Sequence, residues 1–432
     1  MRVVKARSEV ESAAADDGAV ARVVDEILAA VAAEGDAAVR RYSSALDGWE
    51  PERFLLSEAE IEACLERVSQ QALDDIAFCQ EQVRRFAQAQ RETLLDLEVE
   101  TLPGVRIGHR HIPVASVGAY IPGGRYPMVA SAHMSIVTAK VAGVERVAAC
   151  TPPLAGRPPD ATIAAMHLAG ADEIYVLGGV QAVAALALGT ETVAPVDVLV
   201  GPGNAYVVEA KRRLFGQVGI DLVAGPTEIL VIADQTADPA IVAADLLGQA
   251  EHGPASPAVL ITTSPVLATQ TLREIERQLE TLPTADVAGV AWREYGEVVV
   301  VTDDEEACEL ADRYAFEHVE VQTADPRWYL DRLRNYGALF LGEATTVAYG
   351  DKTIGTNHVL PTARAARYTG GLWVGKFLKT VTYQECDEQA SASVGEICAR
   401  QCRIENFEGH ARSCDIRVDK YRSAALAGRE RA

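Results

Sequence analysis

The chain has 432 residues, 49% of them hydrophobic, and its formal net charge is −22. A chain of this length and composition is expected to form two or three domains with an ample core. The excess of acidic residues argues against nucleic acid and anionic membranes as partners. No apolar stretch reaches the roughly 20 residues of a membrane span, and residues 1–19 contain no signal-peptide core. We therefore predict a cytoplasmic protein that binds neither nucleic acid nor membrane.

The eight cysteines form no CxxC pair, and a long cytosolic chain is expected to keep them as free thiols. Two of them, Cys398 and Cys402, are four residues apart in a stretch that reads as a helix. This spacing is more typical of a packed helix face than of a metal-binding pair.

Residues 1 to about 95 read as helices. The stretch 19–48 is amphipathic and ends at a glycine, and Ser57 with Glu60 forms the capping box that begins another helix. Residues 105–120 have the pattern of strands and end in Pro-Gly-Gly.

Short β-rich runs then alternate with helical stretches, which indicates βαβ units on parallel sheets. The first series has runs at 144–151, 172–178, 196–201 and 228–234. The second has runs at 257–264, 296–303, 318–323 and 337–342. We expect two α/β domains, the second of them completed by the N-terminal helices, and a charged helical tail at 373–432.

Gln249 and His252 are three residues apart at the end of a predicted helix, where they would share one face. An amide oxygen and an imidazole at this spacing can bind one divalent cation, and imidazole suits zinc. Taken alone, the stretch is more typical of a polar helix end that Gly253 caps.

Glu317 and His318 stand together at the start of an apolar, strand-like run. Neighbouring side chains of a regular strand point to opposite faces, so the two can act together only if the backbone turns there. The polar segment 349–362 follows another strand and is expected to be a loop, in which Asp351 could bind a metal and His358 a substrate. The alternative is an ordinary turn-rich loop.

Two glycine-rich turns follow predicted strands and are candidate phosphate sites. One begins YIPGG at Tyr120, and the other runs from Gly201 to Asn204 and precedes a helix. The second begins like a dinucleotide fingerprint but lacks the third glycine, because residue 206 is tyrosine. Each of these signals is weak by itself.

Taken together, these segments resemble the histidinol dehydrogenase family over nearly the whole chain. The matching runs, in order, are YIPGG, TAKVAGV, LVGPGNAYVVEAKR, GIDLVAGPTEILVIAD, ADLLGQAEHGP, the Glu317-His318 pair, GTNHVLPT and the stretch from Glu405 to His410. Their order and spacing are specific to the family.

The resemblance implies an α/β fold of two related, incomplete Rossmann-like domains, with a helical N-terminal element and a tail that crosses to the partner in a homodimer with shared active sites. The implied parts are an N-terminal element at 1–19, a first domain at 20–119 with 227–372 that holds the zinc and catalytic residues, a second, NAD-binding domain at 120–226, and the tail at 373–432. Each subunit is expected to bind one Zn²⁺ and NAD.

The family's site residues carry over to matching positions of this sequence. The implied residues are Gln249, His252, Asp351 and His410 of the partner subunit for zinc; Tyr120, Gln181 and Asn204 for NAD; Thr227, His358 and Glu405 for the substrate; and Glu317 and His318 for catalysis.

The family oxidises a primary alcohol through an aldehyde to a carboxylate and reduces two NAD in turn. His318 would take the alcohol proton, because an imidazole titrates near working pH. Glu317 would activate the water that is needed for the second oxidation. Zinc would orient the substrate oxygen or amine.

The sequence departs from the usual family pattern in three places, at His133, at Trp373 with Lys376, and in the tail run 405–410. These variants resemble the sulfopropanediol 3-dehydrogenase branch, which oxidises 2,3-dihydroxypropane-1-sulfonate to sulfolactate. Arg125, His133 and Lys376 could pair with a sulfonate. We therefore favour the small anionic alcohol as substrate.

The alternatives are oxidation of L-histidinol to L-histidine, with neutral drift in surface loops, a dehydrogenase that stops at the aldehyde, and a non-catalytic zinc- or nucleotide-binding relative. Glu317 argues against the one-step enzyme, and the intact catalytic pair and ligand positions argue against the non-catalytic relative. No acidic residue is clearly placed to bind a ribose, so NAD is implied by the resemblance alone.

Overall fold

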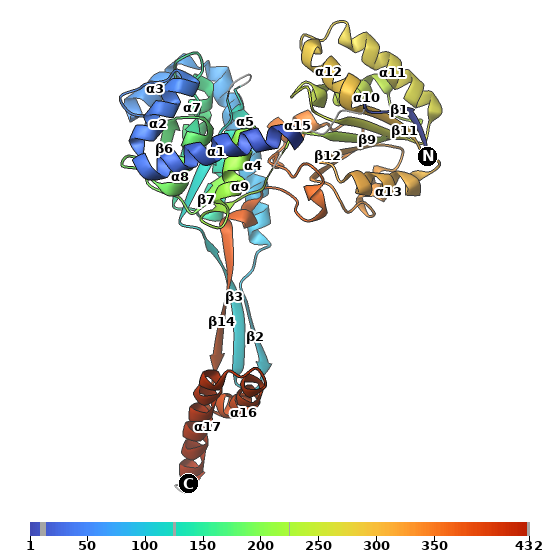
Figure 1. The fold of residues 1–432 in the computed structure, drawn as a ribbon. Coiled ribbons are helices and arrows are strands. Elements are labelled where there is room, and N and C mark those ends of the chain that lie inside the picture. Colours follow the sequence, from blue (N-terminus) through green and yellow to red (C-terminus); the bar gives the residue numbers. More distant parts are fainter. Residues whose placement is uncertain (9–13, 124–126, 224, 430–432) are drawn as a thin grey trace. The chain divides into compact units, whose positions relative to one another are not determined.

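In the computed structural model the chain forms two compact units, and the structure describes residues 1–8, 14–123, 127–223 and 225–429 (Figure 1). Residues 1–91 and 114–377 form the larger unit, which contains two parallel sheets. Residues 92–113 and 378–432 form the smaller unit. Among the described residues, no helix is long and apolar enough to cross a membrane.

The first sheet of the larger unit has five parallel strands in the order β6-β5-β4-β7-β8. Numbered along the chain this order is 3-2-1-4-5, that of a Rossmann fold without its sixth strand, with the topological switch point between β4 and β7. The strands are β4 (Ser116–Tyr120), β5 (Arg146–Thr151), β6 (Glu173–Val176), β7 (Val198–Val200) and β8 (Gly219–Ile220). The connecting helices are α5 (Val129–Ala132), η2 (His133–Val137), α6 (Thr138–Ala142), α7 (Asp160–Leu168), α8 (Gly179–Leu188) and α9 (Ala205–Leu214).

The N-terminal helices pack on this five-stranded part of the unit. They are α1 (Ala14–Glu34), α2 (Asp36–Tyr42), η1 (Ser43–Asp47), α3 (Glu58–Arg67) and α4 (Gln70–Glu92). Val24, Ile27 and Val31 of α1 are buried in one core with the alanine-rich face of α8. The expected placement of residues 20–119 in the other domain is therefore wrong. Helix α1 packs on α8 and α9 and α3 packs on α7, β4 is the central strand here, and residues 92–113 belong to the smaller unit.

The second sheet has six strands in the order β1-β11-β10-β9-β12-β13, and only β1 is antiparallel to its neighbour. Without β1 the order is again 3-2-1-4-5, so the two α/β parts are related as expected. The strands are β1 (Arg2–Lys5), β9 (Ile229–Ala233), β10 (Ala258–Thr262), β11 (Gly296–Val300), β12 (His318–Gln322) and β13 (Ala338–Leu341).

Helices cover both faces of the six-stranded sheet (Figure 1). On one face lie α10 (Pro239–Ala250), α11 (Pro265–Leu279) and α12 (Ala285–Tyr295), and on the other α13 (Asp304–Tyr314) and α14 (Pro326–Leu330); α15 (Val347–Lys352) follows β13. Every residue of β9 and β10 is buried, as expected for apolar runs in a parallel sheet that is covered on both sides.

Local sequence signals begin several helices. The predicted capping box of α3 is present, because the Ser57 side chain accepts a hydrogen bond from the Glu60 N–H while the Ser57 N–H donates to the Glu60 carboxylate at 2.7 Å. Asp238 caps α10 through its side chain, which accepts from the Ala240 N–H, and Pro239 stands in the first turn of the helix.

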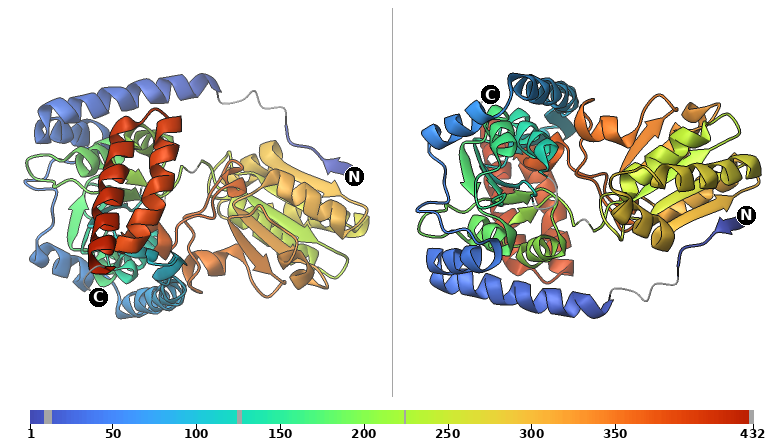
Figure 2. Two further views of the ribbon diagram at one scale, coloured as in Figure 1. Left: turned by 90° about the horizontal axis from the view of Figure 1, so that it is seen from below. Right: turned by 90° about the horizontal axis from the view of Figure 1, so that it is seen from above.

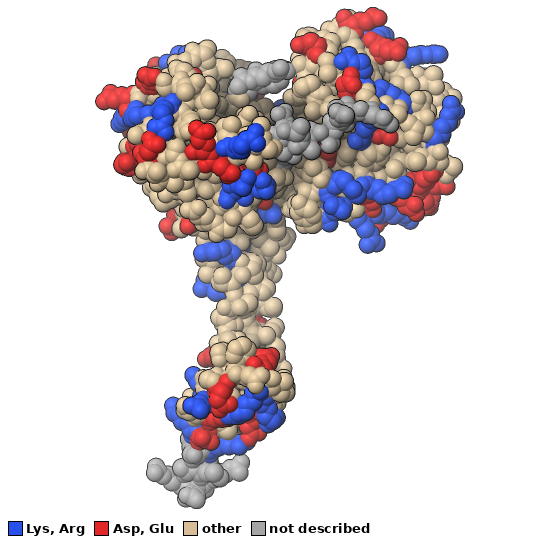
Figure 3. All heavy atoms as spheres, viewed as in Figure 1, with Lys and Arg blue, Asp and Glu red and all other residues tan. Residues whose placement is uncertain are grey.

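The smaller unit is an antiparallel ribbon joined to a helical hairpin. The ribbon is formed by β2 (Leu97–Leu102), β3 (Val105–Pro113) and β14 (Leu378–Cys386), and the hairpin by α16 (Glu388–Ile404) and α17 (Glu408–Arg429), which lie side by side (Figure 2). On the face shown in Figure 3, basic and acidic side chains are interspersed over this hairpin.

The prediction that the tail from residue 373 is helical is wrong for residues 378–386. This stretch, LKTVTYQEC, is rich in residues that favour strands, and it pairs over its whole length with β3, which lies far earlier in the chain. A pairing partner so distant in sequence leaves no local signal.

Candidate active site

A polar cavity of about 130 Å³ lies within the larger unit. Its polar lining consists of Thr362 and six residues that the sequence predicted, Thr227, His252, Glu317, His318, Asp351 and His358. Met128 and Gly203, from loops of the five-stranded part, also line it. The structure therefore brings six of the predicted site residues to one place.

These side chains gather at the amino ends of two adjacent strands. Thr227 precedes β9 by two residues, His318 is the first residue of β12, and β9 pairs with β12. Helix α10 leads back to this edge and brings Gln249 with it. The predicted pair Glu317 and His318 thus lies at the start of β12, as its place in the sequence indicated, and Asp351 and His358 follow β13.

Asp351 lies on a helix, not in the predicted loop. α15 covers residues 347–352, so that only the stretch from residue 353 onward is irregular. Glu317 lies outside the regular strand, and its carboxylate is 3.5 Å from His318 Nδ1. The backbone therefore leaves the regular strand conformation at Glu317, which allows both side chains to line the same cavity.

Glu317 is held by its neighbours at the start of β9. Its Oε2 accepts a hydrogen bond from Thr227 Oγ1 at 2.5 Å and one from the Glu228 N–H at 3.3 Å. Burial raises the pKa of Glu317, whereas His318 and the hydrogen bond from Thr227 act in the opposite direction. The carboxyl group is thus fixed in place and easier to protonate than an exposed glutamate.

His318 is 2% exposed and offers one nitrogen to the cavity. Its Nδ1 lies 3.1 Å from the Glu228 carbonyl oxygen, to which it can donate, and its Nε2 has no hydrogen-bond partner. Burial lowers the pKa of His318, but Glu317 and Asp351 outweigh burial and raise it to about 9. The nearest carboxylate oxygen to Nε2 is Asp351 Oδ1, at 3.8 Å.

Asp351 stands beside His252 and His358. His358 Nδ1 lies 3.1 Å from the Asp351 carbonyl oxygen, and its Nε2 lies 3.1 Å from Ser131 Oγ. Burial lowers the pKa of both His252 and His358. Burial acts to raise the pKa of Asp351, but the combined effect of His318 and His358 outweighs burial and lowers this pKa to about 2. A carboxylate beside two imidazoles that are easily kept neutral suits a divalent cation.

The donor set fits a zinc ion. Gln249 is 3% exposed, and its Nε2 donates to Thr227 Oγ1, which leaves the amide oxygen as a ligand atom. With His252 and Asp351, this gives one amide oxygen, one imidazole and one carboxylate within the larger unit, and Nε2 of His318 is buried without a hydrogen-bond partner. Glu405 and His410 belong to the smaller unit, where both are exposed.

The predicted NAD residues lie on the five-stranded part. Asn204 caps α9, since its Oδ1 accepts from the Tyr206 and Val207 N–H groups at 3.1 Å each, and it borders a cavity of about 560 Å³. This cavity and the polar cavity share Gly203 and Gly225 as lining. The two cavities are therefore adjacent.

The turn before Asn204 is built at the switch point between β4 and β7. Gly201 has φ = 113°, and a Cβ there would lie 2.1 Å from the Tyr120 carbonyl oxygen, so only glycine fits. The buried pair Lys211 and Asp221 holds the turn, because Lys211 donates to the Gly201 carbonyl and Asp221 accepts from the Gly201 N–H.

Tyr120 and Gln181 are buried beside this turn. The Tyr120 hydroxyl accepts from the Gly179 N–H at 3.3 Å, and Gln181 Nε2 donates to Asp47 at 3.0 Å. Gln181 Oε1 is buried without a hydrogen-bond partner. Neither residue lines the two cavities described above.

Glu228 is a site residue that sequence reasoning missed. It is 6% exposed, and burial together with the nearby Glu317 raises its pKa to about 8. Its carbonyl orients His318, and its side chain accepts from the Glu317 N–H at 3.3 Å. The sequence feature that could have indicated Glu228 is an acidic residue directly before a fully apolar strand.

Two of the three expected sulfonate-binding cations, His133 and Lys376, do not line the polar cavity. His133 is 3% exposed, its Nδ1 is bonded to Gln80 Nε2 at 3.2 Å, and burial lowers its pKa to about 4, so it is neutral at pH 7. Lys376 lines a different cavity, of about 710 Å³, together with Trp373. Arg125 lies outside the described residues.

Comparison with known proteins identifies the family. The model of the histidinol dehydrogenase family matches residues 10–418. The chain belongs to the histidinol dehydrogenase family. It is an oxidoreductase, and members of this family use NAD and zinc.

Relatives within the family include enzymes with different names. A histidinol dehydrogenase homolog of Shouchella clausii is 61% identical and covers 96% of this chain and 98% of its own length. The sulfopropanediol 3-dehydrogenase of Ruegeria pomeroyi is 48% identical over 94% of each chain. The crystal structure of histidinol dehydrogenase from Elizabethkingia anophelis is 32% identical, with a TM-score of 0.90 over 96% of this chain and 94% of that one. This histidinol dehydrogenase family member thus has the fold expected from its sequence.

Proposed function

We propose that the polar cavity oxidises a primary alcohol through the aldehyde to the carboxylate, with transfer of two hydrides to NAD. The net reaction consumes the alcohol, one water and two NAD⁺, and it releases the carboxylate, two NADH and three protons. The observation that supports this proposal is the pair of buried titratable groups, Glu317 and His318, held 3.5 Å apart with His318 Nε2 free of protein partners.

In the first step the neutral form of His318, whose share grows as the pH rises toward its pKa of about 9, accepts the proton of the alcohol at Nε2 while the carbon loses hydride. The Glu228 carbonyl, which accepts from Nδ1–H, fixes the ring orientation and leaves Nε2 as the base. In the second step Glu317 accepts a proton from the water that adds to the aldehyde, and Thr227 keeps its carboxylate oriented. Proton transfer by each group occurs within a buried site, where orientation lowers the barrier.

Gln249, His252 and Asp351 would hold one zinc ion per subunit, and His410 of the partner subunit would complete the set. Zinc in such a site orients and polarises the substrate oxygen or amine. Asn204 would bind NAD at the amino end of α9, with Tyr120 and Gln181 as further contacts. A cytoplasmic homodimer with active sites shared between subunits is part of the same proposal.

The substrate that we favour is (R)-2,3-dihydroxypropane-1-sulfonate, which would yield sulfolactate. It is supported by the sequence departures from the usual family pattern and by the 48% identity to a sulfopropanediol 3-dehydrogenase. Of the three cations considered from the sequence, Arg125 is the one that we retain, because it lies three residues before Met128, which lines the cavity.

The alternative substrate is L-histidinol, and one observation favours it. Among the described residues, the cavity lining includes two carboxylates, Glu317 and Asp351, and neither lysine nor arginine. Such a lining suits a substrate with a positively charged amine.

Steady-state kinetics with both alcohols would distinguish these substrates. In the zinc-loaded protein we expect turnover of the sulfonate, and Arg125→Gln should lower kcat/KM for it by roughly 10-fold or more, because a charge-assisted hydrogen bond is lost. Lys376→Gln is the matched control, since Lys376 lines the other cavity. Turnover of L-histidinol alone, or the same loss in both variants, would contradict the assignment.

A further inference from the structure

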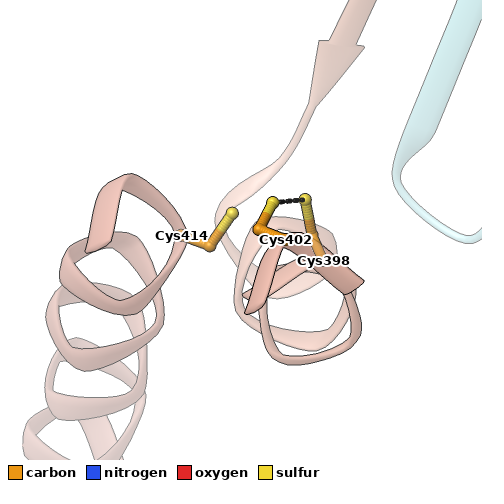
Figure 4. Close-up of side chains that lie close together, drawn as sticks. All are labelled: Cys398, Cys402 and Cys414. Atoms are coloured by element: carbon orange, nitrogen blue, oxygen red, sulfur yellow. Dashed lines mark hydrogen bonds between the residues drawn. The ribbon is translucent and has the colours of Figure 1, made fainter. Parts of the chain in front are cut away.

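Three thiols meet in the helical hairpin of the smaller unit. Cys398 and Cys402 lie on α16, and Cys414 comes from α17 and points toward Cys402 (Figure 4). The three Sγ atoms all lie within 4.8 Å of one another, and the Sγ atoms of Cys398 and Cys402 are 3.9 Å apart. Among the described residues, this is the one group of three or more His, Cys, Asp or Glu side chains that meets this spacing.

The sulfur separations match those of a metal-thiolate site. Sulfur ligands about 2.3 Å from a cation, spaced as in trigonal or tetrahedral coordination, lie roughly 3.8–4.0 Å from one another. The 3.9 Å between Cys398 and Cys402 already has this value, and the limit of 4.8 Å leaves Cys414 less than about 1 Å to move. A rotation about its side-chain bonds can supply such a shift.

The hairpin holds the two helices in this arrangement. Cys398 and Cys402 are separated by four residues and thus share one face of α16. The close approach of α17 requires Gly395, because a Cβ there would lie 2.7 Å from Val418. An ion pair between Arg403 and Asp415 also joins the helices, at 2.5 Å. The thiols are therefore positioned by the fold and need not be gathered by the cation.

These thiols are accessible, unlike those of the core. Cys398 is exposed and Cys402 and Cys414 are half-buried, whereas Cys64, Cys150 and Cys308 are buried in the larger unit. Accessible cysteines that converge from two helices contribute little to a hydrophobic core, so packing does not account for them.

We propose that Cys398, Cys402 and Cys414 bind one thiophilic d¹⁰ cation, Zn²⁺ or Cu⁺, which joins α16 to α17. Thiolates select such cations, whereas the proposed catalytic ligands are nitrogen and oxygen atoms. Binding replaces three S–H bonds by three sulfur–metal bonds and releases three protons to solvent. The joined hairpin includes Glu405 and His410 at its turn, but the thiol site does not depend on any role of these two residues in catalysis.

The test uses Cd²⁺ as a spectroscopic probe on the full-length, reduced and metal-stripped protein. Only sulfur ligands give the ultraviolet charge-transfer absorption of a Cd²⁺–thiolate complex, so occupation of the catalytic site does not contribute. We expect this absorption to saturate at one equivalent of thiolate-bound Cd²⁺ and to be lost in Cys402→Ser and Cys414→Ser. Cys386→Ser, an exposed cysteine of the same unit outside the cluster, should keep it. Absence of the band, or its persistence in the variants, would overturn the proposal.

Alkylation of the unaltered protein, followed by mass spectrometry of its peptides, provides a test that needs no variant. Bound Cd²⁺ should slow the alkylation of Cys398, Cys402 and Cys414 by 10-fold or more and leave Cys386 unaffected. Competition by Zn²⁺ and by Cu⁺ for the same band then distinguishes the two cations. Equal labelling of all four cysteines with and without Cd²⁺ would contradict the site.

Discussion

At the scale of residues, the proposed mechanism divides two proton-transfer tasks between two neighbouring residues. His318 offers Nε2 to the cavity with its ring held by the Glu228 carbonyl, and Glu317 is held by Thr227. The first oxidation needs one base for the alcohol proton, and the second needs a group that activates water. Substitution of each side chain should therefore impair a different one of the two oxidations.

We predict that His318→Asn lowers oxidation of the alcohol by about 10²-fold or more, the usual contribution of a general base. Glu317→Gln should impair oxidation of the supplied aldehyde more than that of the alcohol, because it removes the group that activates water. The measurement is NADH formation from the alcohol and from the aldehyde, with the zinc content of each variant determined in parallel.

Unchanged zinc content with these two distinct losses supports the assigned roles. Near-normal alcohol turnover by His318→Asn would reject this histidine as the base. An equal loss on both substrates in Glu317→Gln would show that Glu317 has a structural role only.

The sequence predicted several of these residues but did not show which other residues they contact. Gln249, Asp351 and His358 were candidates from their sequence context, and the family resemblance implied their roles. The structure brings Asp351 and His358 to the polar cavity, and Gln249 contacts Thr227, which lines it. Glu228 was missed, because its contact with Glu317 depends on the pairing of β9 with β12. His133 was misjudged, since sequence alone does not show that it is buried against Gln80.

At the scale of elements, the two sheets have the same strand order but place their candidate sites at opposite ends of the strands. In the five-stranded sheet, Gly201 to Asn204 follow the carboxyl end of β7 at the switch point, where nucleotides bind in such folds. In the six-stranded sheet, the catalytic pair lies at the amino end of β12. The long apolar runs predicted these strands well, because burial on both faces leaves a clear pattern.

The strands that the sequence did not predict are those without such burial. β1 and β2 are short and largely exposed, and β14 is exposed over most of its length. β1 and β14 are stabilised by pairing with strands that are distant in the chain, β11 and β3, whereas β2 forms a hairpin with β3, which directly follows it. Their own residues therefore give too weak a signal to separate them from loops or from a helix.

A buried carboxyl group in β12 gives the protein a pH-dependent stability. Burial and the neighbouring Asp245 raise the pKa of Glu320 to about 8, from 4.5 in an unfolded chain. Because the folded-state pKa is the higher one, this contribution is complete below pH 4.5 and is lost as the pH rises through 8. It should cost on the order of 2 kcal/mol between pH 6 and 8.

We predict that Glu320→Gln, which cannot ionise, removes most of this loss. The measurement is the melting temperature at pH 6 and pH 9, which should fall by several degrees less in the variant than in the unaltered protein. Glu280→Gln, a change on the surface of the same part, should behave like the unaltered protein. The same pH dependence in all three proteins would show that Glu320 is already ionised in the folded state.

At the scale of the whole molecule, the proposed site needs residues from both compact units. Gln249, His252 and Asp351 belong to the larger unit, and Glu405 and His410 belong to the smaller one. In the proposed homodimer each active site combines the larger unit of one subunit with the smaller unit of its partner. Two inactive variants can then complement one another.

We predict that His318→Asn and His410→Ala subunits, each inactive alone, regain activity when they are co-expressed. A mixed dimer has one site with both defects and one site with neither, so random pairing should restore about a quarter of the normal activity per subunit. The measurement is the turnover of the purified mixture against each parent. No recovery, with mixed dimers confirmed by differently tagged subunits, would place His410 in its own subunit's site or outside catalysis.

The central claim is a four-electron oxidation at one cavity, and the number of NADH formed per alcohol tests it most directly. The zinc-loaded protein would be given excess NAD⁺ and a limiting amount of (R)-2,3-dihydroxypropane-1-sulfonate, or of L-histidinol if that is the alcohol it accepts. We predict two NADH per alcohol and the carboxylate as product. One NADH per alcohol with accumulated aldehyde would contradict the role of Glu317, and no NADH from either alcohol would contradict the proposed substrates.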